Sequence, residues 1–118
     1  MKKVFLTVDL EEWYDLEYLS GFDLKSSGVE VIPRIIDFLD MLDELGVKAT
    51  FFAVAEHTEK NADIIREIVR RGHEIACHGL DHKLLYEKGD ETFREEIAEA
   101  KRILERVARR PVIGYRAS

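Results

Sequence analysis

The sequence predicts an α/β fold in which parallel strands alternate with helices in the order βαβαβαβ. Four short runs rich in apolar, β-branched and aromatic residues are separated by segments whose apolar residues recur at helical spacing. Strands that alternate with helices pair in parallel through right-handed crossovers. The length of 118 residues and the hydrophobic content of 46% suit a single domain, residues 1–118, with one core.

The first half of the chain is predicted to hold two strands and one helix. Residues 3–10, KVFLTVDL, are mostly apolar or β-branched, as expected of a buried strand. Residues 13–29 mix polar residues with glycines and serines and are expected to form a loop. From Val31 onward apolar residues recur at helical spacing, and Gly46 is a natural C-terminal stop for that helix. Residues 47–54, VKATFFAV, predict the second strand, with both phenylalanines in the core.

The second half continues the alternation. Residues 61–72, NADIIREIVRRG, have a helical apolar pattern that ends at a glycine, and residues 73–78, HEIACH, predict a short third strand. A third helix is expected over residues 91–109, and residues 112–118, VIGYRAS, predict a fourth strand. With only four strands, both outer edges of the sheet stay open, which favours association with another chain.

Composition and charge argue against several classes of partner. The net charge of −6 disfavours nucleic acid or an anionic membrane surface as the main partner. No apolar run approaches the roughly 20 residues of a membrane span. Asp9 interrupts the N-terminal apolar run and no small-residue cleavage site follows, so we expect a cytoplasmic chain. The single cysteine, Cys77, excludes an internal disulfide and fits a reducing compartment.

Polar side chains collect where the predicted strands end. In parallel α/β folds, ligands bind at the C-terminal ends of the strands. Three acids lie at the end of the first strand, two histidines and an acid at the end of the third, and an arginine near the end of the fourth: Asp9, Glu11, Glu12, His78, Asp81, His82 and Arg116. This convergence predicts a functional site at one rim of the sheet.

The stretch HGLDH at residues 78–82 suggests a metal site. Two neutral imidazoles, His78 and His82, and one carboxylate form a common ligand set for Zn²⁺, and also for Fe²⁺ or Co²⁺. The alternative is that a His-x-x-x-His spacing arises by chance on a surface. The strand-end position and the acidic first strand favour the metal.

The acids of the first strand offer a base and a ligand. Asp9 lies in an apolar strand, where an unpaired charge is costly, and it suits a base that takes a proton from an attacking water. The alternative is that it caps the next segment or pairs with an arginine. Glu11 and Glu12 face opposite ways in an extended chain, and Glu11 shares the parity of Asp9.

Four stretches of the sequence resemble a known family: TVDLEEWY, KATFFAVAE, RRGHEIACHGLDH and GYRAS. In this order and spacing, they are similar to the motifs of the polysaccharide deacetylase catalytic domain, also called the NodB-homology domain or carbohydrate esterase family 4. The first motif resembles the VDLEEW branch of that family. The resemblance covers essentially the whole chain and implies roughly the N-terminal half of a distorted (β/α) barrel.

The resemblance also implies roles for individual residues. Asp9 matches the catalytic base, His78 and His82 match the two metal-binding histidines, and Arg116 matches the arginine that orients the base. The position of the usual carboxylate ligand holds a leucine here, so the resemblance points to Glu11 as the third ligand and leaves Glu12 as the alternative.

The implied activity is metal-dependent hydrolysis of N-acetyl groups on the amino sugars of a polysaccharide, with Zn²⁺ as the expected metal and Co²⁺ or Fe²⁺ as alternatives. Trp13 and Tyr14 are candidates for stacking on a sugar ring, or for anchoring their loop. The family's later motifs, which carry the acetyl pocket and the general acid, do not occur in these 118 residues. We therefore expect this chain alone to be a weak or inactive catalyst.

Two other functions compete with this interpretation. A phospho-acceptor receiver domain would need an aspartate at the end of the third strand, where His78 stands, and a fifth strand that ends in lysine. A non-catalytic half-barrel would act by assembly alone. In either the catalytic or the assembly role, the open edges predict a homo-oligomer.

Overall fold

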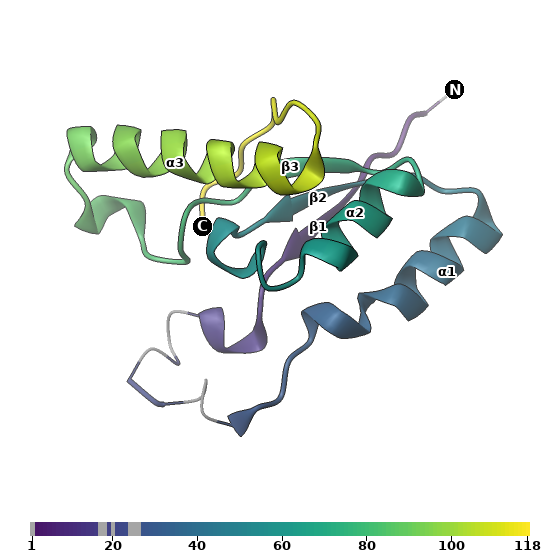
Figure 1. The fold of residues 1–118 in the computed structure, drawn as a ribbon, viewed down its shortest axis with the longest axis horizontal. Coiled ribbons are helices and arrows are strands. Elements are labelled where there is room, and N and C mark those ends of the chain that lie inside the picture. The colour runs from purple at the N-terminus through teal and green to yellow at the C-terminus, as the bar shows by residue number, and fades with distance from the viewer. Residues whose placement is uncertain (1, 17–18, 20, 24–26) are drawn as a thin grey trace.

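The computed structural model describes residues 2–16, 19, 21–23 and 27–118 (Figure 1). Across these ranges the strands form one parallel sheet in the order β1-β2-β3. The strands are β1 (Leu6–Leu10), β2 (Ala49–Ala53) and β3 (Glu74–Cys77). The α/β class and the parallel order that the sequence predicts are confirmed.

Three α-helices separate and follow the strands: α1 (Ile35–Leu45), α2 (Ala62–Arg70) and α3 (Asp90–Ala108). Helices α2 and α3 lie side by side and pack on β3 (Figure 1). Short 3₁₀ turns connect the elements: η1 (Trp13–Asp15), η4 (Ile32–Arg34), η5 (Ala55–His57) and η6 (Leu85–Glu87). Gly46 ends α1 in the left-handed conformation, φ 64°, as its sequence position predicts.

The two faces of the sheet differ in burial. Along β2, Ala49, Phe51 and Ala53 are buried under the helices, whereas Thr50 and Phe52 on the other face are only partly buried. The core therefore lies between the sheet and the helices, and includes Leu39, Leu42, Phe51, Ile65, Ile68, Ala100 and Leu104. The partly open face is the one that carries the site described below.

Strand β1 is shorter and more exposed than the sequence predicts. It begins at Leu6, whose partner Ala49 is the first residue of β2, so residues 3–5 extend past the end of the neighbouring strand. Val4 and Phe5 are 92% and 83% exposed. The expectation of a buried strand over residues 3–10 is wrong because β1 lies at the edge of the sheet.

The fourth strand predicted over residues 112–118 is not formed as a strand. Its backbone follows β3 in parallel, with a single bridge between Cys77 and Tyr115. Cys77 N donates to Gly114 O at 2.8 Å, and Arg116 N donates to Cys77 O at 2.9 Å. Because β3 itself ends at Cys77, the pairing stops after these two hydrogen bonds. The segment still lies where a fourth strand would, so Arg116 reaches the rim.

In the part of the chain that the structure describes, no helix is both long enough and apolar enough to cross a membrane.

Candidate metal and catalytic centre

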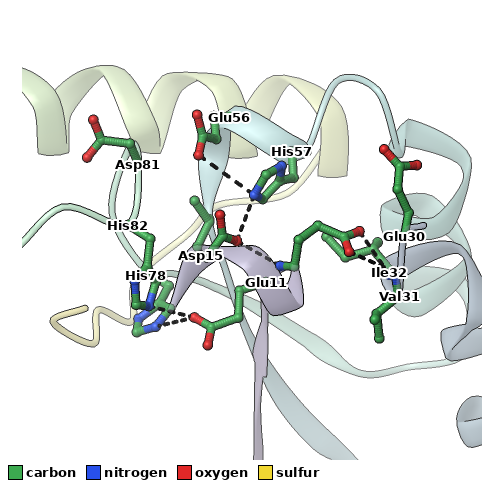
Figure 2. Close-up of polar contacts among 12 residues, drawn as sticks. Glu11, Asp15, Glu30, Val31, Ile32, Glu56, His57, His78, Asp81 and His82 are labelled. Carbon is green, nitrogen blue, oxygen red and sulfur yellow. Dashed lines mark hydrogen bonds and ion pairs between the residues drawn. The ribbon is translucent and has the colours of Figure 1, made fainter. Parts of the chain in front are cut away.

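Three predicted ligands meet at the C-terminal rim of the sheet. Glu11 follows β1, while His78 and His82 follow β3. Glu11 Oε2 lies 2.8 Å from His82 Nε2 and 3.2 Å from His78 Nε2 (Figure 2). One potential ligand atom from each residue lies within 4.8 Å of the others, a spacing that one metal ion can bridge.

Backbone hydrogen bonds fix the loop that carries the two histidines. His78 N donates to Ala53 O at 2.9 Å, and Ala55 N donates to Gly79 O at 3.0 Å, so this loop is tied to the end of β2. Gly79 adopts φ 93°, where a Cβ atom would lie 3.1 Å from the backbone oxygen of Asp81. A residue with a side chain is strained there, so the turn that returns His82 toward His78 requires glycine.

Asp81 lies in the turn between the two histidines, and among the described residues its side chain bonds to lysines and not to either histidine. Its Oδ1 accepts hydrogen bonds from Lys83 N at 3.2 Å and Lys88 Nζ at 2.9 Å, and Lys88 also pairs with Glu96. Burial raises the pKa of Asp81, but the hydrogen bonds from Lys88 and Lys83 N and the charges of both lysines together outweigh it, and the pKa falls below its usual value. Asp81 therefore stabilises the turn that carries the two histidines.

The hydrogen bond to the second nitrogen of His78 determines its tautomer. His78 Nδ1 lies 2.9 Å from Arg116 O, and because a carbonyl only accepts, Nδ1 carries the proton in the neutral ring. The lone pair is then on Nε2, at 3.2 Å from the carboxylate of Glu11. Two acceptor atoms at this distance repel each other unless a cation lies between them.

The hydrogen-bond geometry of the cluster also fits a metal. Glu11 Oε2 is buried and, despite its short distances to the two rings, is aligned with neither as a hydrogen-bond acceptor. His82 Nδ1 is buried without a hydrogen-bond partner among the described residues. The donor set of two imidazoles and one carboxylate, with an orphaned oxygen at its centre, suits a divalent transition metal.

Asp9 lies beside this cluster and pairs with Arg116. Arg116 Nη1 donates to Asp9 Oδ1 at 2.7 Å, while Asp9 Oδ2 lies 4.0 Å from His78 Nε2. Both partners are open to solvent, with side-chain exposures of 39% for Asp9 and 38% for Arg116. Asp9 is therefore not the buried charge that an apolar strand suggests, and one of its oxygens faces the cluster.

Glu12 lies away from the cluster, although it was the alternative ligand. Its side chain accepts hydrogen bonds from Val31 N at 2.7 Å and Ile32 N at 3.1 Å, and it is almost fully buried. Its own N–H donates to Asp15 Oδ2 at 2.7 Å. Glu12 thus caps the start of η4 and is not in a position to complete the triad with the histidines.

Trp13 and Tyr14 follow Glu12 in η1. Trp13 Nε1 donates to Val29 O at 3.1 Å, and the two rings meet edge to face with centroids 5.8 Å apart. Burial and the nearby acids, Glu12 first, raise the pKa of Tyr14 to about 12. These contacts fit the loop-anchoring role for Trp13, and sugar stacking by either ring stays a prediction.

A second polar cluster was missed by sequence reasoning. His57 Nε2 lies 2.8 Å from Asp15 Oδ2 and 3.7 Å from Glu56 Oε1 (Figure 2). Both side chains are largely buried, with exposures of 11% for His57 and 4% for Asp15. Burial opposes both charges, but their mutual hydrogen bond raises the pKa of His57 and lowers that of Asp15. The pair connects η1 to η5, and no local sequence pattern predicts this contact.

Comparisons with known proteins agree with the motifs. The family model for polysaccharide deacetylase matches residues 20–118. A peptidoglycan-N-acetylglucosamine deacetylase of Bacillus cereus is 36% identical over 80 residues, which make up 68% of this chain and 28% of that protein. The chain spans about a third of the length of the curated relatives it matches first.

Two solved structures extend the likeness. A family 4 acetyl xylan esterase from Clostridium thermocellum, solved with a cobalt ion, superposes with a TM-score of 0.69 at 25% identity over 94% of this chain and 46% of that one. A mutant of the Bacillus anthracis CE4 family pseudoenzyme BA3943 with restored enzymatic activity gives 0.71 at 25% identity, over 96% and 35%. By the matched family model and these relatives, the chain belongs to the polysaccharide deacetylase family and spans only part of its fold.

Proposed function

We propose that the protein carries the metal-binding half of a hydrolase that removes N-acetyl groups from the amino sugars of a polysaccharide. The observation that carries this proposal is the meeting of Glu11, His78 and His82 around one orphaned carboxylate oxygen, with Asp9 Oδ2 4.0 Å from His78 Nε2. A base directly beside a ligand triad is the arrangement that metal-assisted hydrolysis needs.

The residues of the site would have separate roles in such a hydrolysis. His78, His82 and Glu11 would hold the metal, and the carbonyl of Arg116 keeps the His78 ring in the ligating tautomer. Asp9 Oδ2 would take a proton from the attacking water as its oxygen bonds to the acetyl carbon, while Arg116 holds Oδ1. The C–N bond then breaks, and the sugar amine leaves after protonation by an acid that the family resemblance places in a later motif.

The metal is proposed to be Zn²⁺, with Co²⁺ or Fe²⁺ as alternatives, because two imidazoles and one carboxylate suit all three ions. When bound, such an ion polarises the acetyl carbonyl and lowers the pKa of water toward about 7. The B. cereus relative is named for N-acetylglucosamine in peptidoglycan and the C. thermocellum structure for acetyl xylan, so both amide and ester acetyl groups must be tested.

Metal content and acetate release test this proposal together. We expect about one transition-metal ion per purified chain, and its loss in the double variant His78→Ala, His82→Ala. His57→Asn is the matched control, since it changes a rim histidine outside the triad. Acetate release from N-acetylated chitooligosaccharides should exceed that from an O-acetylated xylan. A chain that takes up no zinc would contradict the site, and a loaded chain that releases no acetate would contradict catalysis by this chain.

A second candidate function is assembly without catalysis. Large apolar side chains are exposed at both edges of the sheet: Val4 and Phe5 beside β1, and Ile113 at 86% exposure beside β3. Open edges of this kind favour pairing with a second copy of the chain. Sedimentation velocity distinguishes the two candidates when combined with the metal measurement: an oligomer without bound metal favours assembly alone.

A further inference from the structure

The side chain of Arg116 lies across the partly open face of the sheet and makes three contacts there. Nη1 donates to Asp9 Oδ1 at 2.7 Å, and Nη2 donates to Thr7 Oγ1 at 3.0 Å. Its Cζ atom lies 4.1 Å from the centroid of the Phe52 ring. Two hydrogen bonds and one ring face therefore define where the guanidinium sits.

The ion pair with Asp9 is too weak to fix the guanidinium by itself. The side chains of Asp9 and Arg116 are 39% and 38% exposed. Ion pairs in contact with water gain little, because solvent screens the attraction and the long arginine side chain loses freedom. Orientation of Asp9 consequently needs further contacts on Arg116.

The register of the sheet places Phe52 where such a contact is possible. Phe52 is the direct partner of Asp9 across β1 and β2, and Ala76 is its partner on β3, so these side chains share one face. Next to them, a Cβ atom on Gly114 would lie 3.0 Å from Ala76 Cβ. The guanidinium lies over a face of the Phe52 ring as a cation–π partner.

We propose that Phe52 and Thr7 are positioning residues for the proposed hydrolysis. The ring of Phe52 fixes the plane of the Arg116 guanidinium and the hydroxyl of Thr7 fixes its rotation. Held in this way, Arg116 occupies Asp9 Oδ1 and leaves Oδ2 directed toward His78 Nε2. Phe52, which the sequence analysis expected in the core, thus positions the base Asp9 through Arg116. The catalytic role of this arrangement rests on the proposed function.

The rotation of the guanidinium gives a direct test that does not need turnover. Nitrogen-15 arginine spectra show separate Nη proton signals when a guanidinium is held, and averaged signals when it rotates freely. Arg116→Lys identifies the Arg116 signals by their disappearance. We expect separate signals in the unmodified chain, in Phe52→Tyr and in Thr7→Ser, which keep the ring and the hydroxyl. We expect averaged signals in Phe52→Leu and Thr7→Val.

Phe38→Leu is the matched control, because it removes a partly buried ring on α1 and leaves the Arg116 contacts in place. Separate signals that persist in both Phe52→Leu and Thr7→Val would overturn the proposal, as would averaged signals in the unmodified chain. Backbone amide spectra check that each variant is folded, and Thr7→Val keeps the test decisive if Phe52→Leu does not fold.

Kinetics of the metal-loaded protein add the catalytic readout. Phe52→Leu should lower kcat by about 10- to 100-fold with KM and metal content nearly unchanged, since a base that is misplaced by about 1 Å loses rate by up to about that factor. An unchanged kcat would overturn the positioning role. If the unmodified protein binds no metal, the proposed function fails, and if it releases no acetate, catalysis by this chain fails; in both cases the spectra still decide whether Phe52 and Thr7 hold Arg116.

Discussion

Adjacent acids at the end of β1 have different environments, and this separates their roles. Glu11 faces the histidines with a buried, unaligned oxygen, whereas both carboxylate oxygens of Glu12 accept backbone hydrogen bonds at the start of η4. We predict that Glu11→Gln weakens metal binding by more than about 100-fold, because losing even an outer partner of a ligand costs about 10–100-fold. Calorimetric titration with zinc measures this.

Glu12→Gln is predicted to lower the stability of the fold and to leave metal affinity nearly unchanged. An amide cannot accept both N–H groups of Val31 and Ile32 as well as a carboxylate does, so the free energy of unfolding should fall by about 1–3 kcal/mol. Metal affinity should stay within about threefold. Urea denaturation of both variants tests the assignment, and weaker zinc binding in a folded Glu12→Gln protein would contradict it.

The pair of His57 and Asp15 predicts a pH dependence of stability. The pKa of His57 is raised, so its contribution is fully present below its ordinary value of 6.5 and is lost as pH rises through the raised pKa. The pKa of Asp15 is lowered, so its contribution is present above 3.8 and is lost as pH falls through the lowered pKa. The difference in the free energy of unfolding between the unmodified chain and His57→Gln should be largest between pH 3.8 and pH 6.5, at about 1–3 kcal/mol.

Thermal denaturation of both proteins across this pH range measures the difference. Asp15→Asn should show a loss with the same direction of pH dependence, since it also removes the ion pair with His57. A stability difference that does not change with pH would show that His57 acts by packing alone.

The direction of a side chain could be predicted from the sequence where it follows from strand geometry. Contacts between residues far apart in the sequence could not be predicted. The alternation of side chains along a strand placed Asp9 and Glu11 on one face and Glu12 elsewhere, as the structure shows. The contact between Asp15 and His57 joins a loop to a turn 42 residues later, and neither residue lies in a periodic pattern.

At the scale of elements, the turn at Gly79 is the most constrained connection at the site. Alanine at φ 93° is strained, and its Cβ would also crowd Ser118 Oγ at 3.2 Å. Gly79→Ala should therefore lower stability by about 1–3 kcal/mol and weaken zinc binding, because His82 depends on this turn. Gly89→Ala is the control: φ is −73° there and no atom lies within 4 Å of the added Cβ, so its cost comes only from the lower preference of a helix N-cap for alanine, about 1 kcal/mol. Equal effects of the two substitutions on zinc affinity would contradict this account.

The centres of the elements were predictable from the sequence, and their ends were less so. Apolar periodicity located all three helices, since their buried faces follow from spacing alone. A strand, in contrast, exists only where a neighbour pairs with it. Residues 3–5 and 112–118 have the composition of strands, but nothing in the described chain completes their ladders. Their strand state depends on pairing that composition does not encode.

At the scale of the whole molecule, a parallel sheet with two incomplete edges exposes apolar surface on both sides. Phe5 lies beyond the paired part of β1, and Ile113 lies in the segment over residues 112–118, which forms a single bridge with β3 at Tyr115. Their exposures of 83% and 86% would be unusual in a closed barrel, whose strands have no free edges. The relatives that the chain matches are longer, since the matched part makes up 28% of the B. cereus protein and 46% of the C. thermocellum chain.

We predict that the isolated chain associates through these edges. The double variant Phe5→Lys, Ile113→Lys should shift it to the monomer, because lysines at an open edge oppose pairing by charge and by solvation. Leu45→Lys is the matched control: Leu45 is also exposed, at 66%, but it ends α1 and does not border the sheet edges. Sedimentation velocity over a range of concentrations measures the shift. A monomeric unmodified chain, or association that survives the double variant and not the control, would contradict pairing through the edges.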